Sequence, residues 1–433
     1  MKIFIDKMGV NCEGVGKIPE GESKDKLIFV NGAIDGELVD VDIISEKKNY
    51  CTGTINGILS LSVNRCEPRC KYFGICGGCD IQHITKDKQH EIKTNVVKQN
   101  IKKLSQIDVE CRNIIQVNDF AYRNKMVFPI NFKDNKLQIG MYEKKSHNIV
   151  EIDECLITND IINNILKLSK KYFDNLDDKQ ILSQLKYLVV RNYLSEVLVT
   201  IVAKSKINLT GYFKHLNNIY GTLGLSLIVG DSQDEIISGK YHHIDGLKYL
   251  SIKEFGVEYK LDNRGFLQVN NEIKRLIYES ILNEICKGDN VIDAYGGAGL
   301  LSAIISKKAK FVISIEINKS ASSSAKKLIE ENNIKNLKCI CGDVKDYIDK
   351  YLLDEAVVIL DPPRSGCDKS VVLSLLNNTD KIKKIIYLSC DHATLARDLK
   401  LLSGKFSISY IQPYDMFPNT KHIETLVVLE KKE

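Results

Sequence analysis

From about residue 263 onward, the chain alternates short apolar runs with stretches whose pattern is typical of helices. The apolar runs are NVIDAY, FVISIE, LKCICGD, AVVILDPP and KIIYLSC. Strands that are separated by helices lie parallel in one sheet, and the helices cover both of its faces. The alternation therefore predicts a doubly wound, Rossmann-like α/β domain over residues 263–433. Two further strand-like runs, ISYIQPYDMF and HIETLVVLEK, complete it.

Ligands of such a sheet bind at the carboxyl ends of its strands, so the residues that follow each run are candidate site residues. Gly297 and Gly299 follow the first run, and they allow the backbone to turn tightly and to approach a ligand closely. The segment DAYGGAG lacks the complete glycine motif of dinucleotide-binding proteins and the Lys-Ser/Thr of a phosphate-binding loop. We therefore expect neither a dinucleotide nor ATP at this edge.

Two acids follow the next two runs. Glu316 comes about 20 residues after the glycine motif begins, which is the spacing at which a carboxylate binds ribose hydroxyls. Asp343 follows the third run and is placed to meet an adenine edge. Taken singly, each acid is equally well explained as a capping or solvated residue. A glycine turn with two acids and no phosphate cradle suits S-adenosylmethionine, a cationic nucleoside without phosphates, and predicts a methyltransferase.

Three residues at later strand ends are candidates for the chemistry. Asp361 in DPPRSG follows the fourth run, and the two prolines stiffen the backbone beyond it; the alternative is an ordinary proline-rich turn. Cys390 stands between a strand and a helix, where helix amides favour a thiolate, although most single cysteines are buried and inert. Glu424 is polar in an otherwise apolar strand. A nucleophilic cysteine and a carboxylate base in one methyltransferase indicate methylation of an unreactive carbon.

The first half of the chain has a different organisation. Residues 1–58 contain short apolar runs separated by glycine turns, which is typical of a small β-barrel of the OB type. Residues 59–262 mix strand-like and helical runs, which predicts an α+β central domain. Residues 64–150 hold 16 Lys and Arg against 9 acids, as a nucleic-acid surface requires, although a solvated basic face has the same composition.

The chain has 13 cysteines and no segment typical of an export signal, so a disulfide framework is not expected. Cys66, Cys70, Cys76 and Cys79 fall within fourteen residues, which indicates a metal or cluster site. Spacing alone leaves open a four-cysteine zinc site that includes Cys66.

Composition restricts the class of protein. With 44% hydrophobic and 27% charged residues, the chain is neither disordered nor fibrous. No apolar run approaches the roughly 18–20 residues of a membrane span, and the amino-terminal segment lacks a signal-peptide core. We expect a cytoplasmic, monomeric protein that does not contact a membrane.

Taken together, the motifs resemble those of the RNA (uracil-5-)-methyltransferases, the RumA/TrmA family, in particular its iron–sulfur-containing 23S ribosomal RNA branch. The resemblance extends over essentially the whole chain. It is carried by FLQVN (266–270), DAYGGAG (293–299), DPPRSG (361–366), SCDHATLARDL (389–399), PNTKHIETLVVL (418–429) and CKYFGICGGCDIQH (70–83). It implies that residues 1–58 form a TRAM domain, residues 59–262 an RNA-binding domain and residues 263–433 the catalytic domain.

The resemblance also implies roles for residues. Cys390 would add to carbon 6 of uracil and Glu424 would remove the carbon-5 proton. The family's donor-site residues fall on Gln268, Tyr295, Glu316, Asp343 and Asp361, and Asp361 also lies where it could contact the uracil. The four ligands of a 4Fe–4S cluster fall on Cys70, Cys76, Cys79 and Cys155.

Two further segments carry expectations. AYRNKM (121–126) matches a family stretch, so Arg123 and Lys125 are candidate RNA or active-site contacts, unless they are a surface pair. Asp391 stands where many relatives have Asn, and its charge would oppose formation of the Cys390 thiolate unless the side chain points away.

The resulting prediction is 5-methylation of a specific uridine in 23S ribosomal RNA, with S-adenosylmethionine as donor. The barrel and the cysteine cluster favour the ribosomal branch, and transfer RNA is the alternative substrate. Two alternatives from other classes remain: an iron–sulfur RNA-binding module that transfers no methyl group, and an amino-group methyltransferase that uses the DPP motif without a cysteine nucleophile.

Overall fold

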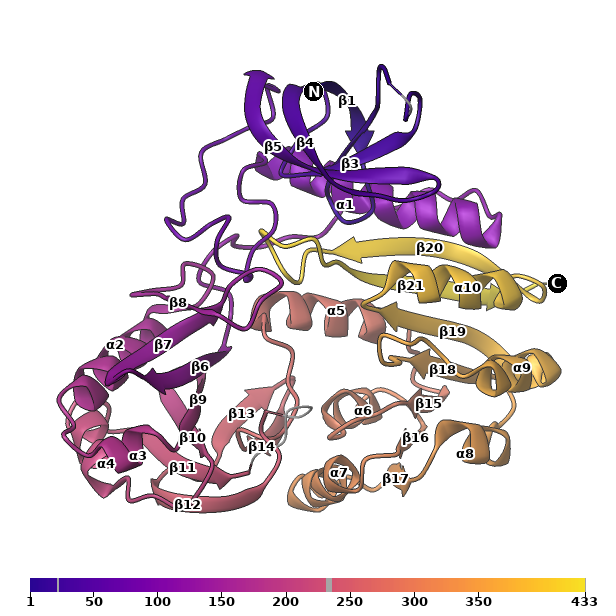
Figure 1. Ribbon diagram of the computed structural model, residues 1–433. Helices are drawn as coiled ribbons and strands as arrows, with labels where there is room; N and C mark the ends of the chain where they lie inside the picture. The colour runs from indigo at the N-terminus through magenta and orange to yellow at the C-terminus, as the bar shows by residue number, and fades with distance from the viewer. Residues whose placement is uncertain (22, 231–235, 433) are drawn as a thin grey trace.

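The computed structural model describes residues 1–21, 23–230 and 236–432. Figure 1 shows three parts: a small barrel, a central sheet with helices on its outer side, and a second sheet with helices on both faces. No helix in the described ranges is long and apolar enough to cross a membrane.

Residues near the amino terminus form a closed five-stranded barrel in the order β1-β2-β3-β5-β4, which confirms the predicted small barrel. Its strands are β1 (Lys2–Met8), β2 (Gly14–Lys17), β3 (Leu27–Asn31), β4 (Leu38–Glu46) and β5 (Tyr50–Ser60). Alternate residues point inward, so that Ile3 and Ile5 of β1 are fully buried. Gly16 permits closure because a Cβ there would lie 2.3 Å from the carbonyl oxygen of Phe4.

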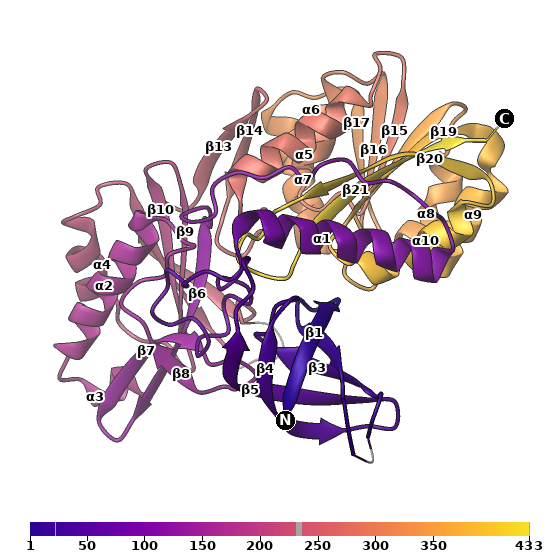
Figure 2. The same cartoon turned by 90° about the horizontal axis from the view of Figure 1, so that it is seen from above.

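A long connection joins the barrel to the central sheet. After the cysteine-rich loop come α1 (Lys86–Asn100) and one π-helical turn (Ile101–Ser105). Figures 1 and 2 show α1 between the barrel and the carboxyl-terminal domain. Val97 and Ile101 belong to the apolar core of that domain, and the following segment pairs with β20 through the bridges Cys111–Ile411 and Ile115–Tyr414. This connection therefore packs on the domain that lies farthest from it in sequence.

The central sheet has seven strands in the order β12-β11-β10-β9-β6-β7-β8. These are β6 (Lys125–Lys133), β7 (Lys136–Tyr142), β8 (Ile149–Glu151), β9 (Leu185–Tyr193), β10 (Glu196–Ala203), β11 (Leu223–Val229) and β12 (Lys240–Gly246). The helices of this part are α2 (Asp160–Asp174), α3 (Lys179–Leu182) and α4 (Thr210–Asn217). A hairpin of β13 (Leu250–Glu254) and β14 (Val257–Leu261) follows, and its apolar side chains join the core of the next domain. That core therefore extends across residue 262.

The carboxyl-terminal sheet has the order β17-β16-β15-β18-β19-β21-β20, which confirms the predicted doubly wound α/β fold. Its strands are β15 (Asn290–Ala294), β16 (Phe311–Glu316), β17 (Leu337–Cys341), β18 (Ala356–Leu360), β19 (Ile382–Ser389), β20 (Phe406–Tyr414) and β21 (Glu424–Lys431). Its helices are α5 (Asn271–Asn283), α6 (Leu300–Ser306), α7 (Lys319–Glu331), α8 (Val344–Tyr351), α9 (Lys369–Asn377) and α10 (His392–Leu402), with a 3₁₀ turn at Thr379–Lys381. Successive residues of β15 enter opposite cores: Val291 packs with α5, α6 and α7, and Ile292 with α8, α9 and α10.

Candidate active site

The candidate residues of the carboxyl-terminal domain gather at one edge of its sheet. Strands β15 to β19 are parallel, so the segments that follow them lie together at their carboxyl ends. Strand β21 is antiparallel to β19, so its first residue, Glu424, lies at this same edge. The strand order thus brings together residues that are more than a hundred positions apart in the chain.

The glycine motif after β15 forms a strained turn. Tyr295 has φ +72°, a backbone conformation that costs a non-glycine residue free energy and that concentrates at functional sites. Gly299 has φ +82°, and a Cβ there would lie 2.8 Å from the Cβ of Ala325. The amide of Gly297 donates to Glu316 Oε2 at 2.9 Å, which ties the turn to the end of the next strand.

The other predicted donor residues are half-buried and held in place. Glu316 accepts a second hydrogen bond from the amide of Asn318 at 2.6 Å. Asp343 caps α8 and contacts Lys345, whose ammonium lies 2.9 Å from its carboxylate. The carbonyl of Gln268 accepts from Asn124 Nδ2 at 3.0 Å. The segments that carry these three residues are thereby fixed by neighbouring backbone and side chains.

Strand register sets the relation between Cys390 and Glu424. Ser389, the last residue of β19, pairs with Thr425 of β21, so Cys390 follows β19 at the end where Glu424 begins β21. Cys390 is half-buried and Glu424 is 4% exposed. The charge of Glu424 acts on the thiol of Cys390, so the two groups are neighbours in a largely buried environment.

Burial and neighbouring charges shift the protonation of this pair. Burial, with the nearby charge of Asp361, raises the pKa of Glu424 to about 8. Burial, with Asp293, raises the pKa of Asp361 to about 7. Burial, with the two carboxylates Glu424 and Asp361, raises the pKa of Cys390 to about 11. In the free protein Cys390 is thus mainly a thiol at neutral pH, whereas Glu424 exchanges its proton in the range that suits acid–base catalysis.

Asp391 does not carry its charge toward the thiol. Its Oδ1 accepts hydrogen bonds from the amides of Ala393 at 3.0 Å and Thr394 at 2.9 Å, so it is the N-cap of α10. The carboxylates that raise the pKa of Cys390 are instead Glu424 and Asp361. The sequence suggested that the charge of Asp391 would oppose ionisation of Cys390. In the structure this carboxylate instead caps the helix.

Arg364 is a site residue that sequence reasoning missed. Its charge lowers the pKa values of both Cys390 and Glu424, against the effect of burial. Its loop is fixed to α10, because the carbonyl of Arg364 accepts from Thr394 Oγ1 at 3.3 Å and the amide of Cys367 donates to Asp398 at 3.0 Å. The sequence feature that could have identified Arg364 is its position in DPPRSG: it is the one cation of the motif and follows Asp361 by three residues.

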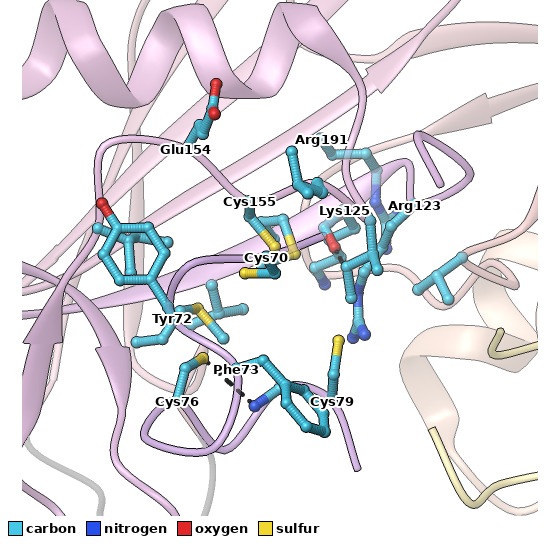
Figure 3. A pocket seen from close by; sticks show the side chains of 18 of the residues that line it. Cys70, Tyr72, Phe73, Cys76, Cys79, Arg123, Lys125, Glu154, Cys155 and Arg191 are labelled. Atoms are coloured by element: carbon cyan, nitrogen blue, oxygen red, sulfur yellow. Dashed lines mark hydrogen bonds between the residues drawn. The ribbon is translucent and has the colours of Figure 1, made fainter. Parts of the chain in front are cut away.

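The four predicted cluster cysteines line one cavity of about 420 Å³. Figure 3 shows their sulfur atoms turned into this space, with the Glu154 carboxylate pointing away. Cys66 is not among the lining residues, and its sulfur lies 3.4 Å from the carbonyl oxygen of Gln82. Within the described ranges, no three His, Cys, Asp or Glu side chains are grouped closely enough to hold a metal ion.

The thiols of this cavity affect one another. Burial raises the pKa of Cys79 to about 12, and Cys155, Cys76 and Cys70 each add to the shift. Burial likewise raises the pKa of Cys155 to about 11, with contributions from Cys76 and Cys70. These mutual effects confirm that the four side chains are close neighbours, although Cys155 comes from a distant segment.

Arg123 and Lys125 lie in the wall of the same cavity. Lys125 Nζ donates to the carbonyl of Asn263 at 3.1 Å, and burial together with Arg191 lowers its pKa to about 7. Arg123 Nε donates to the carbonyl of Lys125 at 3.1 Å. The pair is therefore part of a built, cationic cavity wall and not a free surface pair.

A family model described as tRNA (uracil-5-)-methyltransferase matches residues 85–432. The chain belongs to this family. An uncharacterized RNA methyltransferase of Clostridium tetani is 34% identical over 99% of this chain and 95% of its own length. One from Clostridium acetobutylicum is 31% identical over 99% and 96%. The predicted activity, S-adenosylmethionine-dependent RNA (uracil-5-)-methyltransferase, is thereby confirmed at the level of the family.

A solved structure has the same fold over nearly the whole length. The Pyrococcus abyssi tRNA (uracil-54, C5)-methyltransferase in complex with S-adenosyl-L-homocysteine superposes with a TM-score of 0.76 at 23% identity. The match covers 99% of this chain and 100% of that one. The barrel, the central sheet and the catalytic domain of this methyltransferase thus form an architecture that also occurs in a second uracil-5-methyltransferase.

Proposed function

We propose that this methyltransferase acts through a covalent adduct on Cys390, with Glu424 as the base. The observation that supports the proposal is the pairing of Ser389 with Thr425, which brings Cys390 next to Glu424 at the ligand-binding edge of the sheet. The Cys390 sulfur forms a bond to carbon 6 of uracil, and the electron pair moves to oxygen 4 as an enolate. Carbon 5 then forms a bond to the methyl group of the donor, whose sulfur–methyl bond breaks so that S-adenosyl-L-homocysteine leaves. Glu424 takes the carbon-5 proton, the double bond between carbons 5 and 6 re-forms, and the sulfur–carbon bond breaks.

The charges at the site suit these steps. The proton of the half-buried Cys390 thiol goes to solvent when the uracil binds, so that the ionised form of Glu424, whose pKa is about 8, stays available for the carbon-5 proton. Arg364 favours the ionised forms of both groups. Asp361, half-buried directly after β18, would accept a hydrogen bond from the uracil. A uridine within folded RNA must be flipped out to reach this edge, at a cost of a few kcal/mol.

The donor site is proposed at the adjacent strand ends. S-adenosylmethionine supplies the methyl group when it is bound. The fit rests on the strained turn at Tyr295, on the open space beside Gly297, where a Cβ would meet nothing within 4 Å, and on the acids at the ends of β16 and β17. Glu316 would accept from the ribose hydroxyls, Asp343 from the adenine edge, and Gln268, Tyr295 and Asp361 would complete the site.

The cavity of the four cysteines is proposed to hold a 4Fe–4S cluster. Cys70, Cys76, Cys79 and Cys155 would hold the cluster, because four cysteine thiolates are a usual ligand set for it. A zinc site that includes Cys66 is less well supported, because Cys66 does not line the cavity that the other four cysteines share. The guanidinium groups of Arg123 and Arg191 line the same cavity and would offset the negative charge of four thiolates.

Metal analysis tests this assignment. Protein purified without oxygen should contain iron and acid-labile sulfide in equal amounts, at about four of each per chain. Cys155→Ser should lose both, whereas Cys66→Ser, the matched control outside the cavity, should keep them. Stoichiometric zinc without sulfide would instead support a mononuclear site.

The proposed RNA is 23S ribosomal RNA, and transfer RNA is the second candidate. The amino-terminal barrel, proposed as a TRAM domain, and the cysteine cavity support the first, together with the basic charge of residues 64–150. The descriptions of the family model and of the Pyrococcus abyssi enzyme favour the second.

A methyl-transfer assay separates the two. Labelled S-adenosylmethionine is given to the anaerobically purified protein with unmodified ribosomal or transfer RNA transcripts, and the methylated nucleoside is identified. We expect 5-methyluridine in the ribosomal transcript. Methylation of transfer RNA alone would reassign the substrate but keep the chemistry. A methylated amino group, or no product with either RNA while the cluster is intact, would overturn the proposed reaction.

A further inference from the structure

The loop that leads into the base Glu424 is held by residues outside the catalytic domain. This loop, residues 415–423, connects β20 to β21 and is called the base loop below. Among the described residues, none donates a hydrogen bond to the Glu424 carboxylate, so its position depends on the backbone that carries it. The contacts of the base loop therefore decide where the base stands.

A buried ion pair fixes the start of the base loop to α1. Lys93 Nζ lies 2.6 Å from Asp415 Oδ1 and donates to the carbonyl of Phe417 at 3.1 Å. Both charged side chains are essentially inaccessible to solvent. His90 Nε2 lies 3.4 Å from the second oxygen of Asp415. Lys93 and His90 hold the pKa of Asp415 below its ordinary value although burial acts in the opposite direction.

The cysteine-rich loop holds the middle of the base loop. The amides of Asp80 and Ile81, directly after Cys79, donate to the carbonyl of Asn419 at 3.0 and 3.2 Å. Asn419 has φ +65°, a conformation that a free loop would not favour, and its Nδ2 donates to the carbonyl of Asp119 at 2.8 Å. Tyr122 adds a hydrogen bond to the carbonyl of Pro418 at 3.2 Å.

We propose that Lys93 and Asp415 are positioning residues for the reaction: they fix the base loop so that Glu424 meets the carbon-5 proton. This inference rests on the proposed covalent mechanism. Because the contacts of Asp80 and Ile81 act on the same loop, the fold around the cysteine cavity supports the same geometry. Both side chains of the ion pair are inaccessible to solvent, so the pair acts on the reaction through the backbone of the base loop.

Loss of the ion pair should affect one step of the reaction, the removal of the carbon-5 proton. Cys390 lies between β19 and α10 and not in the base loop, so addition and methyl transfer should continue when the loop shifts. Removal of the carbon-5 proton should slow, because a misplacement of about 1 Å can cost roughly 10²-fold in rate. The methylated adduct between Cys390 and RNA should then accumulate.

The test uses the double variant Lys93→Met/Asp415→Leu in the full-length, anaerobically purified protein. Replacing a buried ion pair by apolar side chains of similar size often leaves a protein as stable as before, so this variant should fold. The matched control is Lys88→Met, because Lys88 is also buried on α1 but its ion pair, at 2.7 Å, joins Asp35 of the barrel. Asp415→Asn, which keeps the shape and an acceptor for Lys93, provides a milder variant.

In single turnover with an RNA that the wild type methylates, the ratio of denaturation-resistant adduct to free methylated RNA is measured. We expect the double variant to raise this ratio at least about tenfold with RNA affinity unchanged, Asp415→Asn to raise it less, and Lys88→Met to match the wild type. A double variant with the wild-type ratio, or equal losses of adduct and product, would overturn the proposal. Failure of the wild type itself to form any adduct would instead overturn the covalent mechanism.

Discussion

Replacing the buried base by its neutral isostere should stabilise the protein. The pKa of Glu424 is raised from an ordinary 4.5 to about 8, so the folded chain keeps a proton that the unfolded chain loses between these values. The stability that this proton provides is therefore lost progressively as the pH rises from 4.5 to about 8. Each pKa unit corresponds to about 1.4 kcal/mol, which gives roughly 3 kcal/mol at pH 7 and about 5 kcal/mol above pH 8.

Glu424→Gln carries no titrating group and escapes this loss. Thermal unfolding of the wild type and the variant is compared at about pH 5, 7 and 8.5. The midpoint difference should be small at pH 5 and grow with pH, up to roughly 10 °C at pH 7, since 1 kcal/mol moves the midpoint of a domain of this size by about 2–4 °C. Glu430→Gln on the same strand is the control, because Glu430 is exposed and should show no such trend.

A flat difference between Glu424→Gln and the wild type would refute this reasoning. So would a variant that is less stable than the wild type at pH 7 to 8.5. Either result would mean that Glu424 is ionised in the folded protein, and the electrostatic basis for its role as a base near neutral pH would be lost.

Three further predictions concern the same edge of the sheet. The single-turnover rate at which methylated RNA is released from the adduct should rise between about pH 6.5 and 8.5, because Glu424, with its pKa of about 8, must be ionised to take the carbon-5 proton; a rate that is flat over this range would contradict the assignment. Arg364→Met should move that profile to higher pH because the charge that lowers the pKa values of Cys390 and Glu424 is gone, and Arg364→Lys should restore it in part. Asp391→Ala should lower stability by about 1 kcal/mol through loss of the α10 cap, measured by chemical denaturation, whereas Asp391→Asn should stay near the wild type.

Local sequence patterns were sufficient to predict the carboxyl-terminal sheet and the amino-terminal barrel. Alternation of apolar strands with helices determines a parallel sheet, and the rule that ligands bind at strand ends selected Asp361 and Cys390 without any structure. The cap formed by Asp391 was also accessible, since Asp is a preferred residue directly before a helix. Its direction, away from the thiol, follows from that geometry.

Contacts between segments that are distant in sequence could not be predicted from local patterns. The proximity of Cys390 and Glu424 depends on the register between β19 and β21, which no local pattern specifies. The buried pair of Lys93 and Asp415 joins residues that are 322 positions apart, and Lys93 looks like any other lysine of a basic helix. Such contacts depend on how whole elements pack, and only the folded structure reveals them.

The most direct test of the covalent mechanism is to isolate the RNA adduct of Glu424→Gln on a denaturing gel and to sequence the attached peptide by mass spectrometry. We expect an adduct that requires both RNA and S-adenosylmethionine, with a methylated uridine bound to Cys390, and its absence in Glu424→Gln/Cys390→Ala. A wild-type protein that forms 5-methyluridine while no variant yields an adduct, or an adduct on another residue, would contradict the roles assigned to Cys390 and Glu424.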